Sequence, residues 1–271
     1  MPTKKTVPSP KFKKTQKAPP AVVAYGPTNK VQSPSDRIHH WMTQPASSVP
    51  PLSRTEMLQE NMNWRIFRIM AEFVEGFDFL MRFQKTVSIF GSARASFSNP
   101  AYQEAKKLGY LLGKEGYAII TGGGPGIMEA GNWGASNAGA PSVGLNIELL
   151  ANERRNQYIK ESRGFHHFFT RKVMLSAAAQ AYVFFPGGFG TLDELFEIVT
   201  LIQTGKMDKR VPVVLLGKAF WQPMIDWITE YAWDQNLFVD KHDLELLHLV
   251  DSAEEAYVLI LELIANDQPP V

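Results

Sequence analysis

The sequence predicts an α/β protein: a Rossmann-like, doubly wound parallel sheet flanked by helices, with an extra N-terminal helix. Short runs rich in β-branched and aromatic residues alternate with longer stretches of helical periodicity, and three of these runs end in glycine-rich turns. Such alternation is typical of parallel sheets, because each crossover between strands places a helix on one face. With 271 residues, 45% of them hydrophobic, the chain is long enough to bury one core of this kind.

Three parts follow one another along the chain. Residues 1–52 are rich in proline and lysine and contain few periodic apolar positions, so they cannot offset their chain entropy by burial. We therefore expect a disordered basic tail there. Residues 53–84 are the expected N-terminal helix, and residues 85–267 the expected Rossmann-like domain.

The N-terminal helix is expected to begin near Ser53, which has capping-box spacing with Glu56. Apolar side chains then recur at roughly helical intervals as far as Phe77, which predicts one helix over about 54–82. The apolar face of this helix packs either within one chain or between chains, and both possibilities stay open.

The remaining elements alternate as a doubly wound fold requires. The expected strands are 86–90, 117–121, 142–147, 181–185, 211–216 and a last one near 245–250. The expected helices are 100–114, 126–139, 170–179, 191–204, 220–233 and 253–265. His166 and His167 are also expected on a strand, where adjacent side chains face opposite sides, so no metal site is predicted.

Composition excludes several classes of function. The chain has no cysteine, which excludes disulfides, thiolate metal sites and cysteine nucleophiles. No run reaches the roughly 18 apolar residues of a membrane span, and the N-terminus lacks a secretory core, so we expect a cytoplasmic protein without a membrane partner. The net charge of +1 gives no reason to expect nucleic acid as a partner.

Residues 1–50 depart from this balanced charge. Eight Lys or Arg residues against one Asp give them a net charge of +7 and leave −6 for the rest. This basic tail is either a solvated extension or an arm that binds RNA or an acidic partner.

Three glycine-rich turns follow expected strands, and ligands of open parallel sheets bind beyond the carboxyl ends of the strands. Glycines there let backbone N–H groups approach an anion, which the dipole of the following helix also attracts. The residues predicted to hold a phosphate are Gly91 and Ser92, then Gly122, Gly123, Gly124 and Gly126, and finally Gly187, Gly188, Gly190 and Thr191. None of the turns is a Walker P-loop or a regular dinucleotide fingerprint.

Two of these turns carry a family resemblance. Residues 186–194 read PGGFGTLDE and match the PGGxGTxxE motif of the Lonely Guy (LOG) family, long misnamed lysine decarboxylases. Residues 122–130, which include Met128 and Glu129, resemble its glycine-rich companion, and Arg171 with Lys172 resembles its third element. The resemblance covers about residues 85–250.

The resemblance implies a hydrolase that acts on N-glycosyl bonds. LOG-type phosphoribohydrolases cleave nucleoside 5′-monophosphates, AMP or cytokinin ribotides, to the free base and ribose 5-phosphate. It also implies a homodimer or a larger homo-oligomer, and no cofactor is expected. The matching positions make Arg171 and Glu194 the catalytic pair and add Met128, Glu129 and Lys172 to the substrate-binding residues.

The side-chain chemistry fits these roles, because cleaving a ribose–base bond creates positive charge at C1′ and negative charge on the base. Glu194 would stabilise the sugar or orient the water, and Arg171 would hold the base or the phosphate with a permanent charge. Alternatives stay open. Thr191 and Glu194 also have capping-box spacing, Glu129 is either a helix acid or a ribose contact, and Asp193 is expected to complement the helix dipole.

Aromatic side chains adjoin the motifs. Phe165, Phe168 and Phe169 are expected to pack in the core, with stacking on a base as the alternative. Trp133 is the tryptophan placed for ligand contact, because it follows the second glycine-rich turn closely.

A non-catalytic protein is the competing hypothesis. The same fold and turns resemble molybdenum-cofactor carrier proteins, which implies a carrier or sensor that holds a phosphorylated, nucleotide-like ligand without cleaving it. The presence of both Arg171 and Glu194 favours the enzyme.

Overall fold

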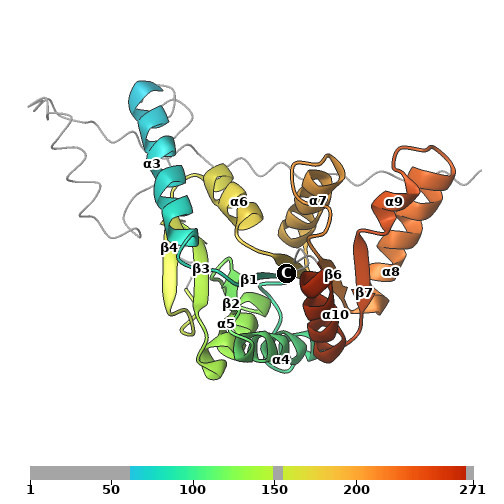
Figure 1. The fold of residues 1–271 in the computed structure, drawn as a ribbon, viewed down its shortest axis with the longest axis horizontal. Helices are drawn as coiled ribbons and strands as arrows, with labels where there is room; N and C mark the ends of the chain where they lie inside the picture. The colour runs from blue at the N-terminus through green and yellow to red at the C-terminus, as the bar shows by residue number, and fades with distance from the viewer. Residues whose placement is uncertain (1–61, 149–154, 267–271) are drawn as a thin grey trace, which may run out of the picture. The chain divides into compact units, whose positions relative to one another are not determined.

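The computed structural model describes residues 62–148 and 155–266, which contain one seven-stranded parallel sheet with helices on both faces (Figure 1). The strand order is β4-β3-β2-β1-β5-β6-β7. The strands are β1 (Thr86–Phe90), β2 (Ala118–Thr121), β3 (Ser142–Ile147), β4 (Glu161–Phe165), β5 (Ala181–Phe184), β6 (Val213–Leu216) and β7 (Leu247–Val250). This arrangement confirms the predicted fold class.

Helices cover both faces of the sheet. They are α3 (Met62–Leu80), α4 (Pro100–Lys114), α5 (Ile127–Ala138), α6 (Phe168–Ala177), α7 (Phe189–Gln203), α8 (Lys218–Trp227), the π-helix η2 (Ile228–Asp234), α9 (Lys241–Leu244) and α10 (Ala253–Asn266). One face packs against α4, α5 and α10, and the other against α3, α6, α7 and α8 (Figure 1). In the part of the chain that is described, no helix has the length and apolar character needed to cross a membrane.

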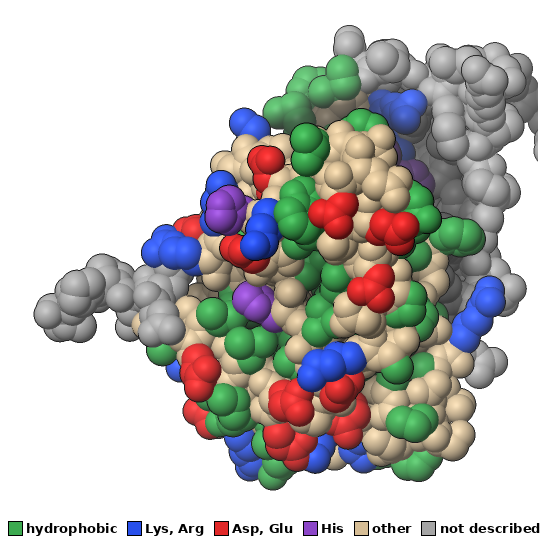
Figure 2. All heavy atoms as spheres, turned by 90° about the vertical axis from the view of Figure 1, so that its right-hand side faces the viewer, with side chains coloured by type: hydrophobic (Ala, Val, Ile, Leu, Met, Phe, Trp, Pro, Cys, Tyr) green, Lys and Arg blue, Asp and Glu red, His purple; other side chains and the backbone are tan. Residues whose placement is uncertain are grey.

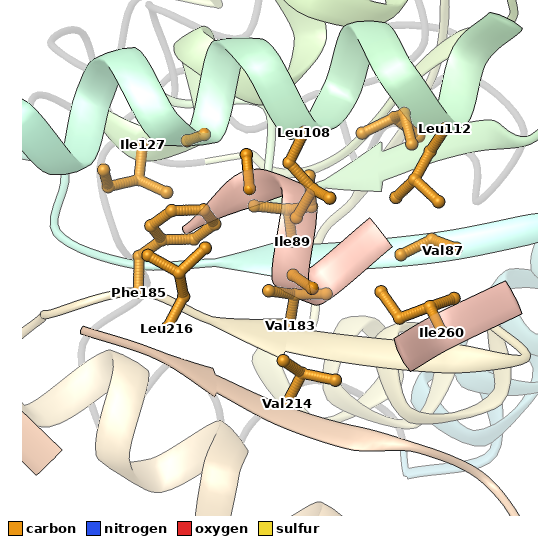
Figure 3. Close-up of a cluster of buried hydrophobic side chains, with 14 of the residues drawn as sticks. Val87, Ile89, Leu108, Leu112, Ile127, Val183, Phe185, Val214, Leu216 and Ile260 are labelled. Atoms are coloured by element: carbon orange, nitrogen blue, oxygen red, sulfur yellow. The ribbon is translucent and has the colours of Figure 1, made fainter. Parts of the chain in front are cut away.

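Each face of the sheet has its own hydrophobic core. The side chains of Val87 and Ile89 on β1 point into the first core, which Figure 3 shows with Leu108 and Ile127 of the covering helices. Phe90 faces the second core, where its ring stacks on Phe184 with centroids 5.0 Å apart. The inner strands are buried on both faces, which explains why they read as continuous apolar runs.

Helices α4 and α5 approach each other at glycines. A Cβ atom on Gly134 would lie 2.1 Å from the carbonyl oxygen of Lys106, and one on Gly109 would lie 2.4 Å from that of Gly131. Backbone atoms therefore occupy the space that a side chain would need, and this helix crossing requires glycine.

The order of the strands creates a switch point at the centre of the sheet. Strands β1 to β4 follow one another toward one edge, and β5 then returns to pair with the other side of β1. The connections that leave β1 and β5 diverge, so a crevice opens beyond the carboxyl ends of these two strands.

The other predicted elements agree with the structure to within two residues at the boundaries that lie in described segments. The helix predicted over 220–233 is divided, because α8 ends at Trp227 and a π-helix continues to Asp234. The tail 1–52 and residues 54–61 of the predicted N-terminal helix lie outside the described residues.

The largest difference lies at β4. No strand is predicted for Glu161–Phe165, because ESRGF has neither alternating nor continuous apolar residues; it is an edge strand, paired with β3 alone. His166 and His167 follow β4, and His167 is the N-cap of α6, so the prediction that this pair lies on a strand is wrong. The carboxylate of Glu72 accepts hydrogen bonds from both N–H groups and directs the chain into the helix.

Candidate active site

The predicted motifs meet in a cleft of about 640 Å³ at the carboxyl ends of β1, β2 and β5. The cleft is lined by residues 90–94, 122, 128, 168, 171, 175 and 188–194. The predicted site residues that line it are Gly91, Ser92, Gly122, Met128, Arg171, Gly188, Gly190, Thr191 and Glu194. The predicted site residues that do not line the cleft are Gly123, Gly124, Gly126, Glu129, Lys172 and Gly187.

A second hollow of about 690 Å³ lies at the β7 edge and is lined by residues 247–250, 254, 255, 258, 259 and 262. Figure 2 shows this side of the molecule, where acidic side chains lie among hydrophobic ones. Three of the lining residues are glutamates, Glu254, Glu255 and Glu262, and none of the glycine-rich turns lines this hollow. A phosphate fits the first cleft better, because glycine-rich turns and Arg171 line that cleft, whereas the first turn of α10 at the second hollow carries Glu254 and Glu255, which repel an anion.

Arg171 lies in the first turn of α6 and reaches across the ends of two strands. Its Nε donates a 2.7 Å hydrogen bond to the carbonyl oxygen of Leu145, and its Nη2 lies 3.5 Å from that of Gly122. A Cβ atom on Gly122 would lie 2.4 Å from Nη2, so glycine is needed there to admit the guanidinium group. The arginine is thus held by backbone oxygens at the cleft wall.

Glu194 is a buried carboxyl group in the wall of the same cleft, with 7% of its surface exposed. Its Oε2 has no hydrogen-bond partner among the described residues. Burial raises the pKa of Glu194 to about 7, and the nearby ammonium group of Lys172 limits this rise. The carboxyl group therefore exchanges its proton near neutral pH, as a group with an acid–base or electrostatic role requires.

The structure rules out the capping-box interpretation of Glu194. Helix α7 has Gly188 as its N-cap, so Thr191 is its third residue and Glu194 lies in the second turn. The N–H group of Thr191 donates to the carbonyl oxygen of Gly188 (3.0 Å), which leaves the preceding N–H groups of the first turn to face an anion.

Lys172 occupies the centre of a cluster of carboxylates. Its Nζ lies 2.6 Å from Asp193 Oδ2, 2.8 Å from Glu197 Oε2 and 3.6 Å from Glu194 Oε1. The interpretation of Asp193 as a helix-dipole residue is wrong, because Asp193 lies beyond the first turn of α7 and pairs with this lysine. Lys172 thus connects α6 to α7 and adjusts the charge state of Glu194.

The glycine-rich turn after β2 rests on buried polar side chains that sequence reasoning missed. Thr121 Oγ1 donates to Asn132 Oδ1 (2.6 Å) and accepts from the N–H group of Gly123 (3.0 Å). Asn156 Nδ2 donates to the carbonyl oxygen of Gly124 and to Asn132 Oδ1, both at 3.0 Å. The signal in the sequence is Asn132, an asparagine at a buried position of α5. These hydrogen bonds hold the glycine-rich turn in place.

The aromatic residues separate into two groups. Phe165 is fully buried in the core as predicted, whereas Phe168 and Phe169 are 53% and 45% exposed, and Phe168 lines the cleft. Trp133 stacks on Tyr158 with ring centroids 4.9 Å apart and does not line the cleft, so ligand contact by Trp133 finds no support. No group of three or more His, Asp or Glu side chains in the described ranges has the arrangement of a metal site.

Comparison with known proteins agrees with the motifs. A family whose model is described as "Possible lysine decarboxylase" matches residues 128–260. The cytokinin riboside 5′-monophosphate phosphoribohydrolase LOG of Oryza sativa subsp. japonica is 29% identical over 67% of this chain and 73% of its own length. LOG7 of Arabidopsis thaliana, a cytokinin riboside 5′-monophosphate phosphoribohydrolase, is 33% identical over 50% of this chain and 62% of its own length.

Solved structures give the same fold. The crystal structure of TM1055 is 26% identical, covers 66% of this chain and 99% of that chain, and has a TM-score of 0.51. The molybdenum cofactor carrier protein of Chlamydomonas reinhardtii is 20% identical, covers 67% and 99% of the two chains, and has a TM-score of 0.52, which is a likeness of fold alone. Together with the motifs at residues 122–130 and 186–194, these matches show that the chain is similar to the LOG family.

Proposed function

We propose that this protein is a phosphoribohydrolase that cleaves the N-glycosidic bond of a nucleoside 5′-monophosphate to give the free base and ribose 5-phosphate. The observation that carries the proposal is the buried Glu194 carboxyl group, which has an unpartnered oxygen, in one cleft with Arg171. The LOG relatives are named as cytokinin riboside 5′-monophosphate phosphoribohydrolases, which supports the same reaction.

The arrangement suits this chemistry step by step. The phosphate binds at the N-terminus of α7, where the spaces beside Gly188 and Gly190 are open. The ionised Glu194 stabilises the positive charge that develops at C1′ as the bond to the base breaks. The oxygen of a water molecule then adds to C1′. One proton of this water passes to the departing base, and the other stays on the new hydroxyl group, so neither C1′ nor the base carries a charge in the products. Arg171 holds the negative charge of the phosphate or of the base.

The apolar side of the cleft selects the kind of base. Met128, Phe168 and Leu175 line the cleft together with the charged pair. A flat aromatic ring fits such a wall, because dispersion and stacking contacts favour it over a hydrated group. A purine ring, as in AMP and the cytokinin ribotides, is therefore the base that we propose.

The proposal is tested by incubating the protein with AMP, other nucleoside monophosphates and isopentenyladenosine monophosphate. Free base and ribose 5-phosphate are separated by chromatography, and nucleotide binding is measured by calorimetry on the same preparation. Release of both products in equal amounts is the expected result. Tight binding without release of base would contradict the enzyme and favour a carrier or sensor of phosphorylated ligands.

The pH dependence of the reaction follows from the pKa of Glu194. Since burial raises this pKa to about 7 and the ionised form stabilises the cationic sugar, kcat/KM is expected to rise with pH up to about 7 and to level off above it. Lys172→Met removes a charge 3.6 Å from Glu194 Oε1, so the midpoint should move to higher pH by about one unit.

The control for Lys172→Met is Lys218→Met, which changes a surface lysine of α8 that pairs with Asp251. The midpoint of the control should equal that of the unchanged protein. A midpoint that moves to lower pH in Lys172→Met, or stays in place, would show that Glu194 does not set the profile.

A further inference from the structure

A second buried acidic residue lies outside the cleft, on α3. Glu72 is 8% exposed. In the described ranges, the buried acidic side chains are those of Glu72 and Glu194. Its carboxylate accepts hydrogen bonds from the N–H groups of His166 (2.9 Å) and His167 (3.3 Å), and also from the hydroxyl group of Thr170. All three donors belong to the entry into α6.

These contacts supply α6 with a cap from another helix. The N-cap residue of α6, His167, makes no capping hydrogen bond with its own side chain. The N–H groups at a helix N-terminus need acceptors, and a carboxylate there also interacts favourably with the helix dipole. The Nδ1 atom of His167 lies 3.2 Å from Glu72 Oε1, without the alignment of a hydrogen bond.

The capped turn carries the arginine of the cleft. Arg171 follows Thr170 directly, and its backbone N–H group donates to the carbonyl oxygen of His167 (3.3 Å). Its side chain is then fixed by the 2.7 Å bond from Nε to Leu145 O on β3. A rotation or shift of this first turn would therefore move the guanidinium group relative to β3 and to the cleft.

Helix α3 packs closely against α6 near this turn. A Cβ atom on Gly76 would lie 2.6 Å from Met174 Sδ, so the glycine lets α3 lie close against α6 one turn after Glu72. The residues that match the family model begin at 128, and α3 ends at Leu80. The cap is therefore supplied by a helix outside the residues that match the family model.

We propose that Glu72 is a positioning residue, which holds the first turn of α6 and through it the guanidinium group of Arg171. The inference rests on the proposed function insofar as Arg171 acts in the reaction. A purely structural role for Glu72 would predict loss of stability without a specific effect on Arg171, and the following experiment separates the two roles.

Two readouts are measured on the full chain for Glu72→Gln and Glu72→Ala. Since small displacements of a charged group can cost about 100-fold in rate, kcat should fall about 10- to 100-fold while KM changes less than about 3-fold. The NMR signal of the Arg171 Nε–H group, assigned by its loss in Arg171→Lys, should exchange faster with solvent. Glu75→Gln makes the same chemical change one turn further along α3, where Glu75 pairs with Arg163 at the surface, and should alter neither readout.

A double-mutant comparison shows whether Glu72 acts through Arg171. In an Arg171→Lys background, Glu72→Gln should lower kcat by less than about 3-fold, because the group that it positions is already lost. An equal loss in both backgrounds, or an unchanged Arg171 Nε–H signal in both Glu72 variants, would overturn the proposal. If the unchanged protein releases no base, the proposed function fails, and the NMR signal still decides whether Glu72 positions Arg171.

Discussion

Replacing Glu194 by glutamine is expected to lower kcat for nucleotide hydrolysis by about 10³-fold, with little change in nucleotide affinity. Glutamine keeps the shape of the side chain but cannot carry the negative charge that opposes the developing cation at C1′. The N-terminus of α7, where we propose that the phosphate binds, and the arginine remain in place, so binding should survive. Chromatographic assay of free base and calorimetric titration with AMP measure the two effects, and Glu262→Gln on the exposed surface of α10 is the control.

The same variant should be more stable than the unchanged protein at pH 8. The folded-state pKa of Glu194 is raised from 4.5 to about 7, so the ionised carboxylate costs stability, and the cost grows as pH rises between these two values. Above pH 7 the cost is roughly 3 kcal/mol, because each pKa unit corresponds to about 1.4 kcal/mol. The Tm of Glu194→Gln should exceed that of the unchanged protein clearly at pH 8 and hardly at all at pH 5.

For the activity assay, a Glu194→Gln variant as active as the unchanged protein would exclude Glu194 from the reaction.

Gly134→Ala is expected to have the largest effect on folding, with a loss of about 2–3 kcal/mol in the free energy of unfolding. Its Cβ atom would lie 2.1 Å from Lys106 O and 2.6 Å from the backbone nitrogen of Tyr110, and neither backbone atom can rotate away. Helices α4 and α5 must therefore separate, which outweighs the gain of about 1 kcal/mol that alanine brings to a helix interior.

Gly131→Ala is the matched control, because it makes the same change on α5 less than one turn away. There the new Cβ atom would meet Ile89 Cδ1 at 3.2 Å, and a side-chain methyl group can shift. Urea unfolding of the two variants should show a clear loss for Gly134→Ala and little or no loss for Gly131→Ala. Equal stabilities would contradict the role that we assign to the glycine crossing.

The parts of the fold with a local signal could be predicted from the sequence. The apolar runs of the inner strands and the helical periodicity between them identify these elements, and the strand-to-turn junctions at Gly91, Gly122 and Gly187 identify the edge where the cleft lies. Strand β4 could not be found in this way. Its residues carry no periodic pattern, and the hydrogen bonds to β3 alone make it a strand.

The sequence predicted the motif residues of the site, but not the residues that hold these motifs in position. Arg171 and Glu194 belong to recognisable motifs, and both line the cleft. The spacing of Thr191 and Glu194 does not reveal which residue caps α7, because helix entry depends on the preceding glycine turn. Likewise, Glu72 and Asn156 act on turns far away in sequence, and only tertiary structure brings them there.

The pairing of β1 with β2 on one side and β5 on the other has a consequence for how the cleft is assembled. The turns that form the cleft leave these three strands, and Glu194 follows the last of them along the chain. During synthesis, a nascent chain that stops before α7 lacks the carboxyl group and one wall of the cleft. The cleft is thus completed by long-range strand pairing, which is a slow kind of contact to form. A nucleotide that binds there stabilises this pairing by mass action, so ligand occupancy and completion of the sheet reinforce each other.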